Sequence, residues 1–139
     1  MTLHSQDPAD AVAYNILADG PTKKIRPDFE LREFRSRDGS IAVLIHPVLA
    51  DGLQQLRIDS GGAVMITSAH RTNAHNSLIG GVEDSRHLYG EAGDVLSDVW
   101  TPPRVQQWAV DMGWGGIGFY HDFTHLDVHG RHRRWGPAR

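Results

Sequence analysis

The sequence contains no cysteine, no long apolar run and no excess of positive charge. Because cysteine is absent, disulfides play no part and any metal site must use nitrogen and oxygen ligands. No stretch approaches the roughly 20 apolar residues of a membrane-spanning helix, so we expect no membrane insertion. A formal net charge of −3 provides no broad basic field, which argues against a nucleic-acid partner.

The first seven residues also lack a basic region followed by an apolar stretch, so they do not resemble a secretory signal. We therefore expect synthesis in the cytoplasm, and action on an external substrate only after delivery by lysis or by a virion. The chain has 139 residues, of which 40% are hydrophobic and 22% charged. These values are typical of one globular domain spanning residues 1–139, and we expect a monomer.

Capping residues and apolar periodicity predict the helices and strands. Three helices are expected, each opened by proline, at residues 8–19, 47–60 and 102–112. Apolar runs predict strands at residues 41–45, 63–67, 92–96, 116–120 and 124–128. A loop-rich stretch fills residues 68–91, and the basic tail after Gly130 carries Trp135 as a packing anchor. Because most strands follow the helices, the expected fold is α+β, with a small antiparallel β-sheet and helices packed on one side.

Histidine is enriched at the end of the chain, where seven of the nine histidines follow residue 69. His87 and Asp94 stand seven positions apart, with Gly90 and Gly93 between them, and His125 follows in a predicted strand. Alternation along the strands points Asp94 and His125 to one face, and the glycines allow the loop bearing His87 to fold close. Two imidazoles and a carboxylate are the protein ligands of a catalytic zinc, which keeps a fourth position for water.

A general base beside that water has three candidates in the sequence. Asp122 lies three residues before His125, although an acidic residue there can also serve only to form the turn. Asp127 projects to the same face as His125 and could act as base or hold a ligand in place. His121 is the third candidate.

Arg71 directly follows the strand predicted at residues 63–67. A guanidinium at the end of a strand can hold a substrate carboxylate with two parallel hydrogen bonds. A surface arginine with no part in the site is the alternative that the spacing leaves open.

Several ordered segments together resemble the M15 zinc peptidases, the group related to bacterial and phage D-Ala-D-Ala carboxypeptidases and peptidoglycan L,D- or D,D-peptidases. The resemblance extends from about Phe29 to Trp135. Its most specific part is Ser85-x-His87-x-x-Gly90-x-Ala92-x-Asp94, the zinc signature of the family. Further matching segments are Ile66-Thr67-Ser68-Ala69-His70-Arg71-Thr72, His75-Asn76, Gly80-Gly81, Gly116-Ile117-Gly118 and Phe123-Thr124-His125-Leu126-Asp127-Val128.

The resemblance implies a Hedgehog/D-Ala-D-Ala-peptidase-like fold and assigns roles to residues. The zinc ligands would be His87, Asp94 and His125. Arg71 would bind the substrate or stabilise the oxyanion, with Ser85 as a further substrate-binding residue and Asp122 as the base. The chain departs from the family at His70, where members usually carry tyrosine, and residues 1–25 form an N-terminal extension outside the resemblance.

The expected function is therefore that of a zinc metallopeptidase that hydrolyses peptide bonds of peptidoglycan stem peptides or cross-links. A carboxypeptidase, an endopeptidase and a phage lysin are all compatible with the sequence. The alternatives are a non-catalytic zinc-containing binding module and a virion structural protein of the same fold. The three intact ligands and a nearby acid favour the enzyme.

Overall fold

A five-stranded β-sheet forms the centre of the computed structural model, which describes residues 1–139. The spatial order is β5 (Val64–Ser68), β6 (Ala92–Ser97), β8 (Thr124–Asp127), β7 (Gly116–Phe119) and β9 (Arg133–Trp135). The first four strands pair antiparallel, whereas β9 runs parallel to β7. The predicted α+β class with a small antiparallel sheet is confirmed. The residue pattern of the basic tail does not predict the parallel strand β9.

Two helices have the bounds that their capping residues predict. Helix α2 (Pro47–Ser60) begins after His46, whose ring nitrogen Nδ1 accepts a hydrogen bond from the Val48 amide, and ends at Gly61 in the left-handed region. Helix α4 (Pro102–Met112) begins with proline and ends before Gly113, which is also left-handed. None of the helices combines the length and the apolar character that crossing a bilayer requires.

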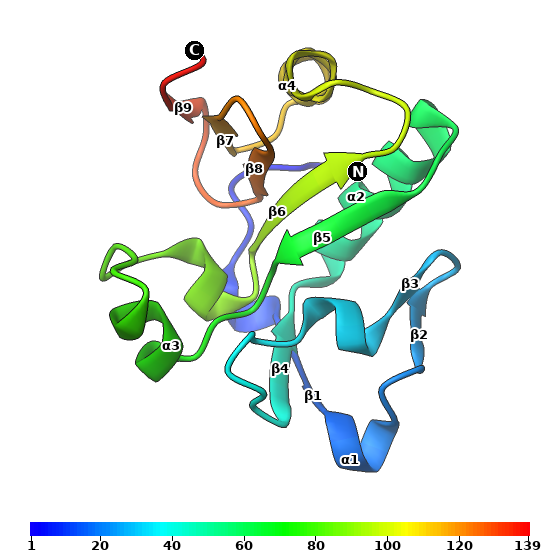
Figure 1. Cartoon of the computed structure of the whole chain (residues 1–139), viewed down its shortest axis with the longest axis vertical. Helices are drawn as coiled ribbons and strands as arrows, with labels where there is room; N and C mark the ends of the chain where they lie inside the picture. The colour runs from blue at the N-terminus through cyan, green and yellow to red at the C-terminus, as the bar shows by residue number, and fades with distance from the viewer.

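Helices α2 and α4 pack against the same face of the sheet (Figure 1). A Cβ atom on Gly93 of β6 would contact Leu53 and Leu49 of α2, and Gln106 of α4 donates to the Thr124 hydroxyl of β8. The face of β6 and β8 that bears residues 93 and 124 is therefore the helix-covered one. Because side chains alternate along a strand, Asp94 and His125 project from the opposite face.

The helix predicted at residues 8–19 is wrong. This region forms a short 3-10 helix η1 (Pro8–Asp10), strand β1 (Val12–Asn15) and a one-turn helix α1 (Ile16–Asp19). Strand β1 pairs antiparallel with β4 (Ala42–Ile45), so the backbone hydrogen bonds go to the partner strand and not along a helix. Asn15 then opens α1 anew by accepting from the amides of Leu17 and Ala18. The Asp7 cap opens only η1, and pairing with β4 replaces the rest of the predicted helix.

The segment before residue 26 is packed into the domain. Leu3 is buried, and its carbonyl accepts a hydrogen bond from the Gly115 amide. The amides of Ser5 and Gln6 donate to carbonyls that follow β8, those of Gly130 and Val128 respectively. This contact between residues 3–6 and residues 128–130, here called the terminal seam, joins the two ends of the chain. Strands β2 (Lys24–Arg26) and β3 (Phe29–Glu30) and the 3-10 helix η2 (Leu31–Phe34) follow.

The stretch predicted as loop-rich contains two short helices. Helix α3 (Asn73–Leu78) begins after Thr72, whose hydroxyl accepts from the His75 amide. The 3-10 helix η3 (Arg86–Tyr89) begins after Ser85, whose hydroxyl accepts from the His87 amide. Both lie on the side of the sheet where Asp94 projects, so they form a wall beside that face.

Candidate metal centre

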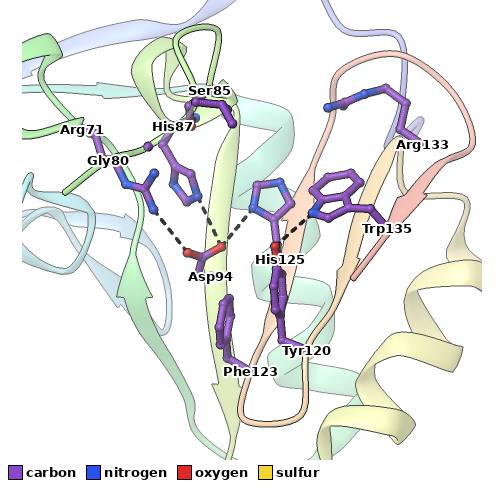
Figure 2. A pocket seen from close by; sticks show the side chains of 12 residues that line it. Arg71, Gly80, Ser85, His87, Asp94, Tyr120, Phe123, His125, Arg133 and Trp135 are labelled. Atoms are coloured by element: carbon purple, nitrogen blue, oxygen red, sulfur yellow. Dashed lines mark hydrogen bonds and ion pairs between the residues drawn. The ribbon is translucent and has the colours of Figure 1, made fainter. Parts of the chain in front are cut away.

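Asp94 and His125 come together because they are direct partners in the β6–β8 ladder. His87 approaches from η3, outside the sheet. One nitrogen or oxygen of each side chain lies within 4.8 Å of one atom of each of the others, and all three residues are buried. Figure 2 shows the three side chains pointing at one another. The structure thus unites the predicted ligand set.

A tight turn after η3 holds the backbone that carries His87. Gly90 adopts a left-handed φ of 71°, and a Cβ atom there would lie 2.6 Å from the Leu44 carbonyl oxygen. Only glycine fits both the conformation and the space. Inside the turn, Nε of Arg86 donates to Glu91 at 3.1 Å, and the Glu91 side chain is completely buried. This ion pair closes the turn from within.

The hydrogen bonds of the two imidazoles determine which nitrogen faces Asp94. Nδ1 of His87 lies 2.7 Å from the Ala69 carbonyl, which can only accept, so the neutral ring leaves Nε2 unprotonated. Nε2 of His125 lies 2.7 Å from Asp127 Oδ2 and donates to it, so Nδ1 is the nitrogen left for the centre. His87 Nε2 and His125 Nδ1 lie 3.2 Å and 3.0 Å from Asp94 Oδ1. Three lone-pair donors that converge in this way suit a positive charge between them, either a metal ion or a proton.

Without a metal ion, a proton on His125 takes that place. Burial alone would lower the pKa of His125, but Asp127 and Asp94 outweigh burial and raise this pKa to about 9. Burial lowers the pKa of His87 and keeps that ring neutral. Burial would raise the pKa of the Asp94 carboxyl, but its hydrogen bond with the protonated His125 holds that pKa well below its usual range. At neutral pH, His125 must therefore lose one proton before all three side chains can bind a metal ion.

Asp127 lies behind His125 and has no oxygen left for another task. Its Oδ2 accepts from His125, and its Oδ1 accepts from Arg133 Nη1 at 2.8 Å and from the His129 amide at 3.0 Å. The Asp127 side chain is completely buried. This geometry matches the second of the two roles left open by the sequence, which is to orient a ligand.

The three ligands lie on the wall of a cavity of about 450 Å³. Arg71 and Ser85, the predicted substrate-binding residues, also line it, whereas Asp122, His121 and Asp127 do not. The full lining comprises Arg71, Gly80, Gly81, Val82, Ser85, His87, Asp94, Tyr120, Phe123, His125, Arg133 and Trp135.

Arg71 is part of the site and not a free surface arginine. Its Nη2 lies 3.6 Å from Asp94 Oδ2, Nε donates to the Ser68 hydroxyl at 3.3 Å, and Nη1 donates to Asn76 Oδ1 at 3.4 Å. The buried Asn76 in turn donates to the Val82 carbonyl, which ties the loop after α3 to Arg71. The guanidinium is consequently held at the edge of the ligand cluster (Figure 2).

Asp122 and His121 are exposed in the turn between β7 and β8. Tyr120 and Phe123 flank them, and these two rings stack with centroids 4.5 Å apart and both line the cavity. Asp122 makes no side-chain hydrogen bond or ion pair, and its backbone lies at the rim. The geometry therefore does not bring the predicted base into the cavity wall.

Three aromatic residues that the sequence does not predict as part of the site form one wall of the cavity, here called the aromatic wall: Tyr120, Phe123 and Trp135. The sequence predicts Trp135 only as a packing anchor. In the structure its ring lies 5.0 Å from the His125 ring, and its Nε1 donates to the Tyr120 hydroxyl at 3.1 Å. Arg133, at the start of the same strand, was not singled out at all. The signal was the Arg-Arg-Trp run in the tail, which becomes informative only once β9 is known to pair with β7.

Comparison with known families agrees with the geometry. The family model described as Peptidase M15 matches residues 26–127, which contain all three candidate ligands. Among curated proteins, no sequence matches the chain. Peptidases of the M15 family are generally zinc-dependent, and the His87, Asp94 and His125 group supplies donors that suit zinc. A match over most of the chain, together with this ligand group on the open face of the sheet, shows that the protein belongs to the Peptidase M15 family.

Proposed function

We propose that this protein is a zinc-dependent peptidase that hydrolyses stem peptides or cross-links of bacterial peptidoglycan. The convergence of His87 Nε2, Asp94 Oδ1 and His125 Nδ1 beside a cavity carries the proposal. Zinc at this position would supply a water of lowered pKa and would polarise the scissile carbonyl. The Ala69 carbonyl and Asp127 keep the two imidazoles in the tautomers that binding requires.

Arg71 and Ser85 are proposed to bind the substrate. Arg71 is cationic, lines the cavity and lies next to the ligand cluster, so it can hold a peptide carboxylate or the oxyanion that forms during attack. The Ser85 hydroxyl accepts from the His87 amide, which leaves its own hydrogen free to be donated into the cavity.

Asp122 is proposed as the general base, acting from the rim. Its neighbours Tyr120 and Phe123 line the cavity, and its carboxylate is not engaged by any other side chain. In this role it would take the proton of the attacking water and return it to the leaving amine. Asp127 is unsuited to this task because both of its oxygens are occupied.

Peptidoglycan is proposed because the family relationship and the cavity both suit its short peptides. A volume of about 450 Å³ lies in the range of small-ligand pockets, roughly 300–1,000 Å³. The cationic wall suits the free carboxylates of such peptides. Carboxypeptidase and endopeptidase cleavage release different fragments, which mass analysis distinguishes.

Digestion of purified peptidoglycan, with mass analysis of the fragments, tests this function. The zinc-loaded protein is expected to release defined peptide fragments, and a chelator, His87→Ala or Asp122→Asn is expected to abolish their release. His132→Asn is a matched control because His132 is exposed and outside the cavity, with a positive φ that asparagine tolerates. Zinc binding without any hydrolysis would instead indicate a non-catalytic binding module. Full activity of His87→Ala would reject the site.

A further inference from the structure

Arg133 is a cavity residue to which the proposed function gives no role. It opens β9, at one edge of the five-stranded sheet, whereas Arg71 follows β5 at the other edge. Both arginines line the cavity, and Figure 2 shows them on opposite sides of the ligand side chains. The cavity therefore has a cationic group at each end.

Protein hydrogen bonds fix the guanidinium of Arg133 in place but occupy only one of its three nitrogens. Its Nη1 donates to Asp127 Oδ1 at 2.8 Å and to the His129 carbonyl at 3.1 Å. A guanidinium has five N–H donors, so the donors on Nη2 and Nε are left without a protein partner. The side chain is 38% exposed, and its Cζ atom lies 5.4 Å from the centre of the Trp135 ring. Arg133 is thus oriented in advance and has free donors.

The turn before β9 leaves room for this arrangement. Gly130 has a φ of 61°, and a Cβ atom at that position would lie 2.8 Å from Cδ of Arg133. Any other residue there would press on the arginine stem. The local backbone thus favours the placement of Arg133 that reaches the cavity.

The charges of the cavity wall favour a ligand with more than one negative charge. Two arginines face the space, and the two carboxylates beside it, Asp94 and Asp127, are engaged by the imidazoles and are paired with Arg71 and Arg133 respectively. A divalent cation would add to the positive charge. Two arginines and a divalent cation together would outnumber the two carboxylates.

We propose that Arg133 binds a second carboxylate of the substrate, separate from the one held by Arg71. The substrate class is then a short peptide with two carboxylates, and Arg133 is a specificity-determining residue. The proposal rests on the proposed function and narrows its substrate. A bidentate guanidinium–carboxylate contact gives strength and geometric selectivity that an amide cannot match.

The test uses one peptide in three forms, L-Ala-γ-D-Glu-L-Lys-D-Ala-D-Ala. One form is unmodified, one has the D-Glu α-carboxylate as an amide, and one has the C-terminal carboxylate as an amide. For the wild-type protein, each amidation is expected to lower kcat/KM by roughly 10- to 100-fold, the size of a lost charged hydrogen bond. Arg133→Gln is expected to remove the penalty of one amidation and to leave the other intact.

Two controls separate binding from support of the metal centre. Arg131→Gln removes the same charge from an exposed position outside the cavity and should behave as the wild type. Zinc content is measured for every variant, because disturbing Asp127 would lower the rates for all three peptides together. Equal loss for all three peptides, or unchanged discrimination in Arg133→Gln, would overturn the proposal.

Calorimetric Kd values for the same peptides keep this inference distinct from the proposed function. If the wild type cleaves none of them and also leaves purified peptidoglycan intact, the peptidase assignment fails. A Kd preference for the carboxylate form that disappears in Arg133→Gln would still support the role of Arg133. Hydrolysis with no dependence on either carboxylate would support the peptidase and reject the second carboxylate site.

Discussion

The two histidines of the centre present different nitrogens, Nε2 of His87 and Nδ1 of His125. A backbone carbonyl selects the first, and the Asp127 side chain selects the second. The sequence therefore predicts the ligands, while the tautomers depend on partners that only the fold provides. At this scale, the groups behind the ligands are where substitutions should be most informative.

Asp127→Asn is expected to weaken zinc binding by about 10- to 100-fold while the protein remains folded. The amide keeps the shape of the side chain but loses the charge that holds His125 and pairs with Arg133. Competition with a chromophoric chelator measures the zinc Kd. Asp111→Asn, an exposed carboxylate of α4, serves as the control. An unchanged Kd in Asp127→Asn would show that His125 needs no such support.

Zinc affinity is expected to rise with pH until about pH 9. Because the pKa of His125 is raised to about 9 in the metal-free protein, zinc must displace a proton below that pH. The apparent Kd should fall by about tenfold per pH unit between pH 7 and pH 9 and then level off. Calorimetric titrations in buffers of different ionisation enthalpy would also count the proton released. A pH-independent Kd across this range would contradict the protonated His125.

The stability of the metal-free protein should show the complementary dependence. A pKa raised above its unfolded value stabilises the fold at low pH, and this contribution from His125 is lost as pH rises through about 9. The lowered pKa values of Asp94 and Asp127 act in the opposite sense. Their contribution is present above the unfolded value near 3.8 and is lost on further acidification.

At the scale of elements, the best-predicted parts are those with local signals. Helices α2 and α4 follow from proline at their start and glycine at their end, and alternation along β6 and β8 orients Asp94 and His125. Helices α3 and η3 were missed because they are too short to show an apolar period. Strand β1 was mistaken for helix because its pairing with β4 is invisible to a local pattern.

Gly90→Ala is expected to destabilise the fold more than Gly61→Ala. Both glycines have a φ slightly above 70°, which costs an L-residue about 1–2 kcal/mol. A Cβ atom on Gly61 would meet no other atom within 4 Å, whereas one on Gly90 would meet the Leu44 carbonyl at 2.6 Å. Denaturant unfolding measures the difference between the two variants. Gly90→Ala should also weaken zinc binding, since its turn carries His87, and equal effects from both variants would contradict this.

At the scale of the whole molecule, the core does not depend on the metal centre. A cluster of 23 buried hydrophobic residues forms the core and includes Leu53 of α2 and Leu126 of β8, whereas the candidate ligands project from the other face of the sheet. Spacing and strand alternation pointed to the three candidate ligands and to Arg71, and the family resemblance assigned their roles. The aromatic wall and Arg133 could not be predicted, because they reach the cavity only through the long-range pairing of β9 with β7.

Removal of the metal is expected to abolish hydrolysis without unfolding the protein. Zinc should raise Tm, because a ligand bound only to the folded state adds RT ln(1 + [L]/Kd) to stability. The near-ultraviolet circular dichroism of the chelated protein should nevertheless keep its native form, since Trp108 and Trp114 lie in the core. Loss of that signal on chelation at 25 °C would mean that the metal is structural.

The terminal seam lies outside the residues matched by the family model, so those residues alone do not form the whole folded unit. Residues 26–127 define the relationship, but residues 3–6 and 128–130 on either side of them bond to each other. A shortened protein cut to the matched boundaries would lose both halves of this closure, including Leu3, whose side chain lies with Trp114 against Gly52. It would also lose the strand that carries Arg133 and Trp135. The unit that identifies the protein is thus smaller than the unit that must be expressed to study it.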